Sequence, residues 1–153
     1  MANTYTQISI QVVFAVKHRN ALIKPSFKEE LQKYISGILK NQNQKLLAIN
    51  SMPDHIHIFF GMLPETKLSN LMRDIKSDSS TFVNENRLCK YRFHWQEGYG
   101  AFSYSRSQRD AVIKYIMNQE RHHKKKTFRE EYLEFLKRYD IEFNDKYLFE
   151  FFE

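Results

Sequence analysis

The sequence predicts a single α+β domain over residues 1–153, with the element order βαββαβ and a further helix near its C-terminus. Three observations support this class. Segments with the two-residue alternation of strands and segments with the 3.6-residue period of helices follow one another in that order. Hydrophobic residues make up 42% of the chain, and with only 4 glycines and 3 prolines long linkers are not expected. The order is typical of a ferredoxin-like or RRM-like antiparallel sheet with its helices mainly on one face.

Three strands and one helix are expected in the first half of the chain. Residues 5–16 alternate weakly and are rich in isoleucine, valine, threonine and aromatic residues, which favours a first strand. A helix is expected to begin at Pro25, because apolar residues recur with helical spacing from there to Leu39. Residues 45–51 and 55–62 predict two more strands, which a short proline-containing turn joins as a hairpin.

Three further helices and a broken strand are expected in the rest of the chain. Apolar residues with helical spacing predict a helix over residues 66–86. Residues 93–104 are rich in aromatic residues and contain two glycines, so they predict one broken strand or two short ones. Helical spacing returns over residues 108–123 and again over residues 128–138. Residues 141–153 form an acidic, aromatic tail, for which packing at a dimer interface is one hypothesis.

The chain is basic, and its charge is unevenly distributed. The formal net charge is +6 and the isoelectric point is near 9.3, which suggests an anionic partner, with nucleic acid as the leading candidate. Residues 121–129 contain five lysines and arginines, two histidines and no acid, whereas residues 141–153 contain four acids and one lysine. The basic segment is either a phosphate-binding surface or a solvated helix end.

Several classes of protein are not expected from this sequence. No apolar run approaches the roughly 18 to 20 residues of a membrane span, so no membrane association is expected. The N-terminal residues lack the basic region and small-residue cleavage site of a secretory signal. The single cysteine, Cys89, excludes an internal disulfide and suits a reducing compartment. We therefore expect a cytoplasmic protein.

Two histidines in the segment Asp54–Phe60 are the first candidates for a functional site. His55 and His57 are two residues apart in a strand-like run, so their side chains share one face of the strand. Two neighbouring imidazoles can hold a divalent metal ion, because each offers a neutral nitrogen. The alternative is that the pair is ordinary polar surface on a half-exposed strand.

The predicted helix over residues 108–123 supplies two more candidates. Tyr115 and Gln119 are four residues apart, so they stack on one side of this helix, beside its apolar stripe. A tyrosine hydroxyl and an amide oxygen placed there can face the sheet and its histidines. Otherwise Tyr115 is a boundary aromatic residue with a solvated hydroxyl, and Gln119 is an ordinary exposed residue.

The combined pattern resembles a known family. A His-hydrophobic-His motif on a strand, followed by a helix with Tyr-Ile-x-x-Gln, is similar to the single-tyrosine HUH transposases of small insertion sequences. The resemblance covers essentially the whole chain, including the element order and the region of Trp95. It implies a DNA transposase that cuts and rejoins single-stranded DNA.

The resemblance also implies roles for the candidate residues. Tyr115 would be the nucleophile that forms a 5′-phosphotyrosine and releases a 3′-hydroxyl. His55, His57 and Gln119 would hold Mg²⁺ or Mn²⁺, which offsets charge on the phosphate and compensates for a tyrosine whose ordinary pKa is about 10. Family members recognise DNA hairpins at the element ends. They act as homodimers in which the tyrosine helix of one subunit can complete the site of the other.

Candidate DNA contacts come from two groups of basic residues. Their members are Lys67, Arg73 and Lys76 on the predicted helix 66–86, and Arg121, Lys124, Lys125 and Lys126 in the basic segment. Trp95, Tyr99 and Tyr104 are expected either to stack on unpaired bases or to pack in the core.

Two other functions remain open at this point. One is a replication-initiator or relaxase-like nickase, which shares the histidine and tyrosine chemistry. The other is a non-catalytic RRM-like nucleic-acid-binding domain, including an inactive, domesticated transposase.

Overall fold

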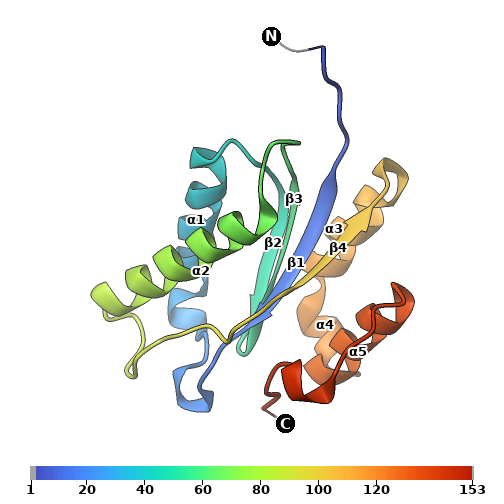
Figure 1. The fold of residues 1–153 in the computed structure, drawn as a ribbon. Coiled ribbons are helices and arrows are strands. Elements are labelled where there is room, and N and C mark those ends of the chain that lie inside the picture. Colours follow the sequence, from blue (N-terminus) through green and yellow to red (C-terminus); the bar gives the residue numbers. More distant parts are fainter. Residues whose placement is uncertain (1–2, 153) are drawn as a thin grey trace.

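A computed structural model describes residues 3–152 of the chain (Figure 1). The strands and helices of these residues are β1 (Ser9–Ala15), α1 (Pro25–Asn41), β2 (Lys45–Met52), β3 (His55–Gly61), α2 (Leu68–Glu85), β4 (Gly100–Tyr104), α3 (Arg109–Met117), α4 (Gln119–His123) and α5 (Phe128–Arg138). Short 3-10 turns occupy Arg19–Ala21, Arg106–Gln108 and Asp145–Tyr147.

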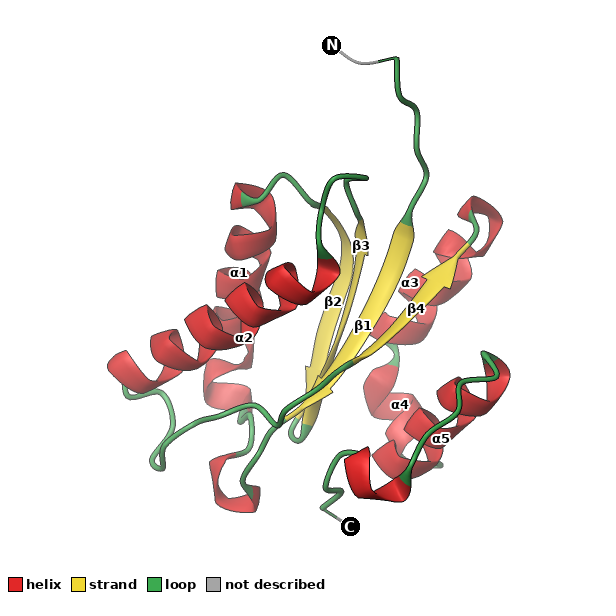
Figure 2. Ribbon diagram, viewed as in Figure 1, coloured by secondary structure: helices red, strands yellow, loops and turns green. Residues whose placement is uncertain are grey.

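The four strands form one antiparallel sheet with the order β2-β3-β1-β4 (Figure 2). β2 and β3 are a hairpin, and β1 lies between β3 and β4, which confirms the predicted ferredoxin-like topology. His57 lies opposite Val13 of β1 and Asn50 of β2, so the histidine strand is paired on both edges.

Helices α1 and α2 cover one face of the sheet (Figure 1). The buried residues of α1 are Phe27, Leu31, Ile35 and Leu39, which recur every four residues and so form one apolar stripe. Ile56 and Ile58 of β3 belong to the same hydrophobic core. The predicted amphipathic helices are therefore confirmed on this face.

The opposite face is also covered, which corrects the expectation that the helices lie mainly on one face. Phe59 of β3 packs with Val112 and Ile116 of α3 in a separate hydrophobic cluster. The side chain of His55 points to the face of β3 opposite that of Ile56. Its ring stacks against that of Phe128 of α5, with 3.8 Å between the ring centroids. β3 is buried on both faces, so the histidine pair lies beneath α3 and α5, away from solvent.

Some predicted boundaries differ from the structure. The first strand begins at Ser9, four residues later than expected, and Tyr5 is 95% exposed. Of the region 93–104, only β4 is a full strand, while Trp95 forms an isolated bridge with Val16. Trp95 packs edge-on against Phe14 at 4.6 Å, so it is a core residue and unavailable for base stacking.

The C-terminal tail packs against its own domain. Phe149 is buried and its ring centroid lies 4.9 Å from that of Tyr132 of α5. The side chain of Gln96 bonds the backbone of Glu150 in both directions, at 2.7 and 2.8 Å. Part of the tail therefore has an intramolecular role, while Phe143 and Tyr147 stay exposed.

No helix within residues 3–152 combines the length and apolar character that crossing a membrane requires.

Candidate active site

The two histidines of β3 are fixed through their Nδ1 atoms. Nδ1 of His57 lies 2.8 Å from the carbonyl Oε1 of Gln11 on β1, and Nδ1 of His55 lies 2.7 Å from Oδ1 of Asp54. Both acceptors are oxygens, so each Nδ1 carries a hydrogen and donates it. The Nε2 atoms of both rings are thereby turned toward the space between β3 and α5.

Glu131 of α5 completes this cluster, although it was not predicted from the sequence. Its Oε1 lies 3.1 Å from Nε2 of His57 and 3.5 Å from Nε2 of His55. The side chain is only 3% exposed. Its neighbours on the buried face of α5 are Phe128, Tyr132, Phe135 and Leu136. An acid inside such an apolar stripe was the sequence signal available for it.

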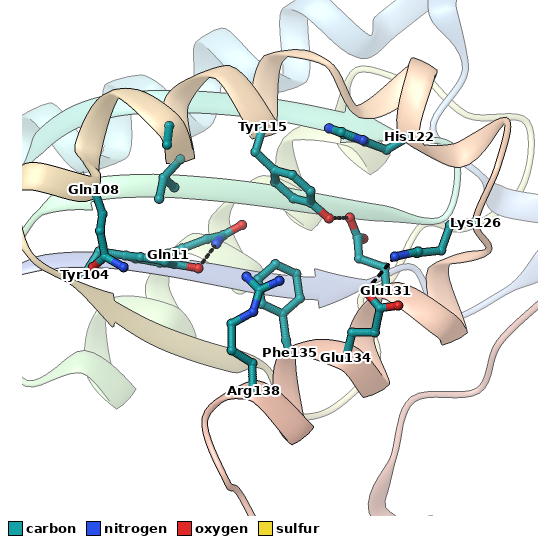
Figure 3. A pocket seen from close by; sticks show the side chains of 12 residues that line it. Gln11, Tyr104, Gln108, Tyr115, His122, Lys126, Glu131, Glu134, Phe135 and Arg138 are labelled. Carbon is teal, nitrogen blue, oxygen red and sulfur yellow. Dashed lines mark hydrogen bonds and ion pairs between the residues drawn. The ribbon is translucent and has the colours of Figure 1, made fainter.

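Tyr115 reaches the same carboxylate from α3 (Figure 3). Its hydroxyl donates a hydrogen bond to Oε2 of Glu131, and its ring stacks on His122 at 4.5 Å. The expectation of a solvated boundary tyrosine is not met, because the hydroxyl has a buried partner. Tyr115, His55 and His57 therefore meet around one residue within one chain.

Gln119 lies beside the cluster, at the point where the predicted helix is interrupted. α3 ends at Met117, Asn118 leaves the helical conformation, and α4 begins at Gln119. Gln119 is completely buried, and its Nε2 donates to Oε2 of Glu131 at 3.1 Å. Its Oε1 lies 2.9 Å from Nε2 of His123 and so faces that ring.

The cluster of His55, His57 and Glu131 has the chemistry of a divalent metal site. One ligand atom from each residue lies within 4.8 Å of the others. Among the described residues, Nε2 of His55 is buried with no hydrogen-bond partner. Two imidazoles and a carboxylate are common ligands of divalent transition metals, and such an ion would satisfy this orphaned nitrogen.

The cluster also shifts the pKa values of its members. Burial alone would raise the pKa of Glu131, but the attraction of His57, hydrogen bonds from His123 and His57 and the nearby ring of His55 hold it well below its usual range. For His55, the hydrogen bond to Asp54 and the charges of Asp54 and Glu131 outweigh burial, so its pKa is raised. Burial dominates at His57 and lowers its pKa. A neutral His57 with hydrogen on Nδ1 presents a lone pair on Nε2 for a cation.

The pKa of Tyr115 is raised in this environment. Burial is the largest cause, followed by the negative charge of Glu131 and the hydrogen bond to it, whereas Gln119 and Arg138 act in the opposite direction. A tyrosine held protonated beside a carboxylate needs either a proton acceptor or added positive charge before it can attack. The cluster offers both kinds of group.

The structure separates the two groups of basic residues proposed for DNA contacts. Lys67, Arg73 and Lys76 belong to α2 and its first turn, on the face of the sheet opposite the histidines. Arg73 is 3.4 Å from Asp74, and Nζ of Lys76 donates to the backbone of Gly98 at 2.8 Å.

The second group, Arg121, Lys124, Lys125 and Lys126, lies on α4 and the loop that follows it. Lys125 and Lys126 border a hollow that also contains Tyr115, His122 and Glu131. Of the two groups, only the second has members that border the candidate active site, namely Lys125 and Lys126, whereas Arg121 and Lys124 line a separate hollow.

A ferredoxin-like sheet that buries a His-x-His pair beneath a tyrosine helix defines the class of HUH-type DNA enzymes predicted from the sequence. Residues 4–119 match the family model described as "Transposase IS200 like", so the chain belongs to this family of DNA transposases. The family membership confirms an enzyme that cuts and transfers DNA.

Individual relatives agree with this membership. The chain is 21% identical over 118 residues to the ISDra2 transposase TnpA of Deinococcus radiodurans, covering 74% of this chain and 84% of that protein. A crystal structure of a candidate transposase from Deinococcus radiodurans R1 has a TM-score of 0.63 at 19% identity, covering 78% of this chain and 95% of that one. The structure of a REP-associated tyrosine transposase bound to a REP hairpin has a TM-score of 0.59 at 15% identity, covering 80% of this chain and 73% of that one.

The family match ends at Gln119, before the residue that completes the cluster. Glu131 and the whole of α5 lie beyond the matched residues. The third candidate metal ligand is thus contributed by a part of this chain that the family pattern does not describe.

Proposed function

We propose that this transposase cuts and rejoins single-stranded DNA with Tyr115 as its nucleophile. The observation that carries the proposal is the contact of the Tyr115 hydroxyl with Glu131, the residue that also faces both histidines. A nucleophile and a candidate metal site that share one buried residue are close enough to act on the same phosphate.

The covalent step follows from the residues around the tyrosine. The Tyr115 oxygen attacks the phosphorus of a DNA phosphodiester, and the bond from phosphorus to the 3′-oxygen breaks. Glu131 holds the Tyr115 hydroxyl in place. The tyrosine proton passes to solvent water as the new bond forms, and the departing 3′-oxygen takes one proton from solvent, so the protons balance. The product is a 5′-phosphotyrosine and a free 3′-hydroxyl. Because the phosphodiester energy is retained in this intermediate, another 3′-hydroxyl can reverse the attack and join the strands.

Nε2 of His55, Nε2 of His57 and Oε1 of Glu131 are proposed to hold Mg²⁺ or Mn²⁺. When bound, the ion supplies positive charge where negative charge builds up on the phosphate oxygens. Glu131 takes the place that the sequence interpretation gave to Gln119 as third ligand. Gln119 is proposed as an additional oxygen ligand only after its amide turns, because its Nε2 faces Glu131 and its Oε1 faces His123.

The proposed substrate is a single strand that carries a hairpin at each element end. The REP-associated neighbour, described as bound to a REP hairpin, supports this choice. A cytoplasmic homodimer is also proposed. Since Tyr115 and the histidines contact Glu131 of the same chain, each subunit would carry a complete site.

The first prediction tests the nucleophile. Wild-type protein is incubated with a labelled single-stranded hairpin from the flanks of its own gene and with Mg²⁺ or Mn²⁺. We expect a protein–DNA adduct that survives denaturation, and we expect Tyr115→Phe to abolish it because the attacking oxygen is removed. DNA binding by this variant should persist, as measured by fluorescence anisotropy.

The matched control is Tyr147→Phe, because Tyr147 is 80% exposed and belongs to the tail. This variant should form the adduct at the wild-type rate. An undiminished adduct in Tyr115→Phe would exclude the nucleophile assignment. Equal binding of single- and double-stranded DNA with no cleavage of either would favour the non-catalytic binding domain.

A further inference from the structure

A cavity of about 440 Å³ opens directly beside the Tyr115 hydroxyl (Figure 3). It lies between α3, α5 and the strands β1 and β4. Residues that line it and enter the argument below are Gln11, Tyr104, Gln108, Tyr115, Glu131 and Arg138. The volume falls within the range of roughly 300 to 1,000 Å³ that is common for small-ligand pockets.

The cavity extends from Glu131 past Tyr115 toward Gln108 and Tyr104 (Figure 3). Tyr115 and Glu131 form its border with the metal cluster, whereas Gln108 and Tyr104 lie at the other end (Figure 3). A strand attached to the tyrosine oxygen can therefore extend from the metal cluster into this cavity. That geometry suits a ligand with a phosphate at one end and a flat, partly polar group at the other.

Arg138 provides a positive charge near the phosphate end. No carboxylate within residues 3–152 pairs with its guanidinium, which lies over the ring of Phe135 at 5.8 Å from the centroid. The other cation of this wall, Lys126, is already bonded to Glu134 at 2.6 Å. An unpaired guanidinium on the wall of a pocket is a good phosphate ligand.

Gln108 provides a hydrogen-bond donor at the end of the cavity away from Glu131. Its Oε1 accepts hydrogen bonds from the backbone and hydroxyl of Ser105, at 2.9 and 3.1 Å. Its Nε2 donates to no other described residue, so its hydrogens are available to a ligand. The neighbouring amide of Gln11 is fully used, since it bonds both Tyr104 and His57. The walls between the two ends include the apolar side chains of Val112 and Phe135.

We infer that this cavity binds the first nucleotide of the strand that becomes attached to Tyr115. Arg138 contacts the 5′-phosphate of that nucleotide, the apolar walls hold its base, and Nε2 of Gln108 donates to an acceptor on the base edge. Because the intermediate is a 5′-phosphotyrosine, the nucleotide in question lies on the 3′ side of the cleaved bond. This inference rests on the proposed function. It means that side chains of the protein recognise the base at that position.

The test uses the oligonucleotide that forms the adduct with the full-length protein. Replacing the base of this nucleotide by an abasic site should slow adduct formation about tenfold, because base contacts are lost. The same replacement several nucleotides downstream should have no effect.

Gln108→Glu keeps the oxygen that Ser105 needs and replaces the free donor by an acceptor. It should therefore change which of the four bases gives the fastest adduct, without preventing the reaction. Arg138→Ala should slow adduct formation about tenfold with every substrate, and Arg138→Lys should restore part of the rate. Lys137→Ala, at the adjacent exposed position, should form the adduct at the wild-type rate.

A second measurement needs no cleavage. Binding of the four deoxynucleoside 5′-monophosphates is followed by isothermal titration calorimetry, and at least one should bind, with Arg138→Ala weakening it about tenfold. If adducts form but neither the abasic site nor Gln108→Glu has an effect, the inferred nucleotide pocket is excluded, whereas the proposed transposase reaction is still supported. If no adduct forms with any substrate, the proposed function is wrong. The calorimetric titration alone then tests whether the cavity binds a nucleotide. If none of the four monophosphates binds, the inference of a nucleotide-binding cavity is wrong.

Discussion

The two oxygens of Glu131 face different partners. Oε1 faces the Nε2 atoms of His55 and His57, while Oε2 accepts hydrogen bonds from Tyr115 and Gln119. One carboxylate can therefore face a metal ion with one oxygen and accept a hydrogen bond from the Tyr115 hydroxyl with the other. The loss of this residue should affect both the histidine pair and the nucleophile.

The pH dependence of stability in metal-free protein should reveal this cluster. The pKa of Glu131 is lowered from an ordinary value of 4.5, so its contribution is complete above pH 4.5 and is lost as the pH falls below it. The pKa of His55 is raised from 6.5, so its contribution is complete below pH 6.5 and is lost as the pH rises through the raised value. The combined contribution is greatest between about pH 4.5 and 6.5.

Glu131→Gln should lower the free energy of unfolding by roughly 3 kcal/mol within that window, because it removes the buried carboxylate charge that faces the histidines. The difference from wild type should shrink at lower and higher pH, as measured by urea denaturation in the presence of a chelator. The exposed Glu142→Gln is the control and should leave the profile unchanged. A constant difference from pH 4 to pH 8 would contradict the predicted role.

At the scale of elements, α5 is held on the sheet by a close approach to β4. A Cβ atom added to Gly100 would lie 2.7 Å from the hydroxyl oxygen of Tyr132 and 2.8 Å from its Cε1. These separations are too short for carbon, so only glycine allows the ring to lie flat on the strand. The position of α5, and with it that of Glu131, depends on this contact.

Gly100→Ala should therefore destabilise the protein by about 1 to 3 kcal/mol and displace α5. Adduct formation should fall as well, because Glu131 moves with the helix. Thermal unfolding and the adduct assay measure the two effects. Gly37→Ala is the control, since an added Cβ at this helical position meets no atom within 4 Å. That change should be neutral or slightly stabilising. Wild-type stability and activity in Gly100→Ala would disprove the packing argument.

The sequence was sufficient to predict most of the elements and half of the site. Period-two and period-3.6 patterns are local, so they located the strands and helices, and alternation placed His55 and His57 on one face. Glu131 could not be assigned in this way. Nothing in the sequence indicates that α5 packs over β3, because that contact depends on tertiary structure alone.

One local feature was also misread for a physical reason. The interruption at Asn118 was missed because helical spacing continues on both sides of it, from residue 108 to residue 123. The sequence also left open a half-exposed histidine strand, because alternation between two polar and several apolar residues does not show whether a second layer of helices covers the polar side.

At the scale of the whole molecule, the sheet separates two layers of helices (Figure 2). The α1–α2 layer packs against the hydrophobic core, whereas α3, α4 and α5 surround the candidate site. The basic residues that border this site are those of α4 and its following loop. We expect DNA to lie along that layer.

Removal of charge from the two layers should affect DNA binding differently. The double variant Lys124→Ala with Lys125→Ala should reduce the slope of log affinity against log salt by about 1.4 for single-stranded DNA, which corresponds to two lost phosphate contacts. Lys67→Ala with Arg73→Ala, on the opposite layer, is the matched comparison and should leave the slope unchanged. Fluorescence anisotropy titrations at several salt concentrations measure this. An equal loss in both variants would mean that DNA contacts both layers.

The origin of Glu131 in a C-terminal helix has a thermodynamic consequence. Two of the candidate ligands belong to β3 and the third belongs to α5, so an ion bound by all three would link the two elements. By reciprocity, any factor that strengthens the docking of α5 raises the affinity for the ion by the same ratio, and the ion strengthens the docking in return. The affinity for such an ion would then depend on the C-terminal segment as well as on the histidine strand.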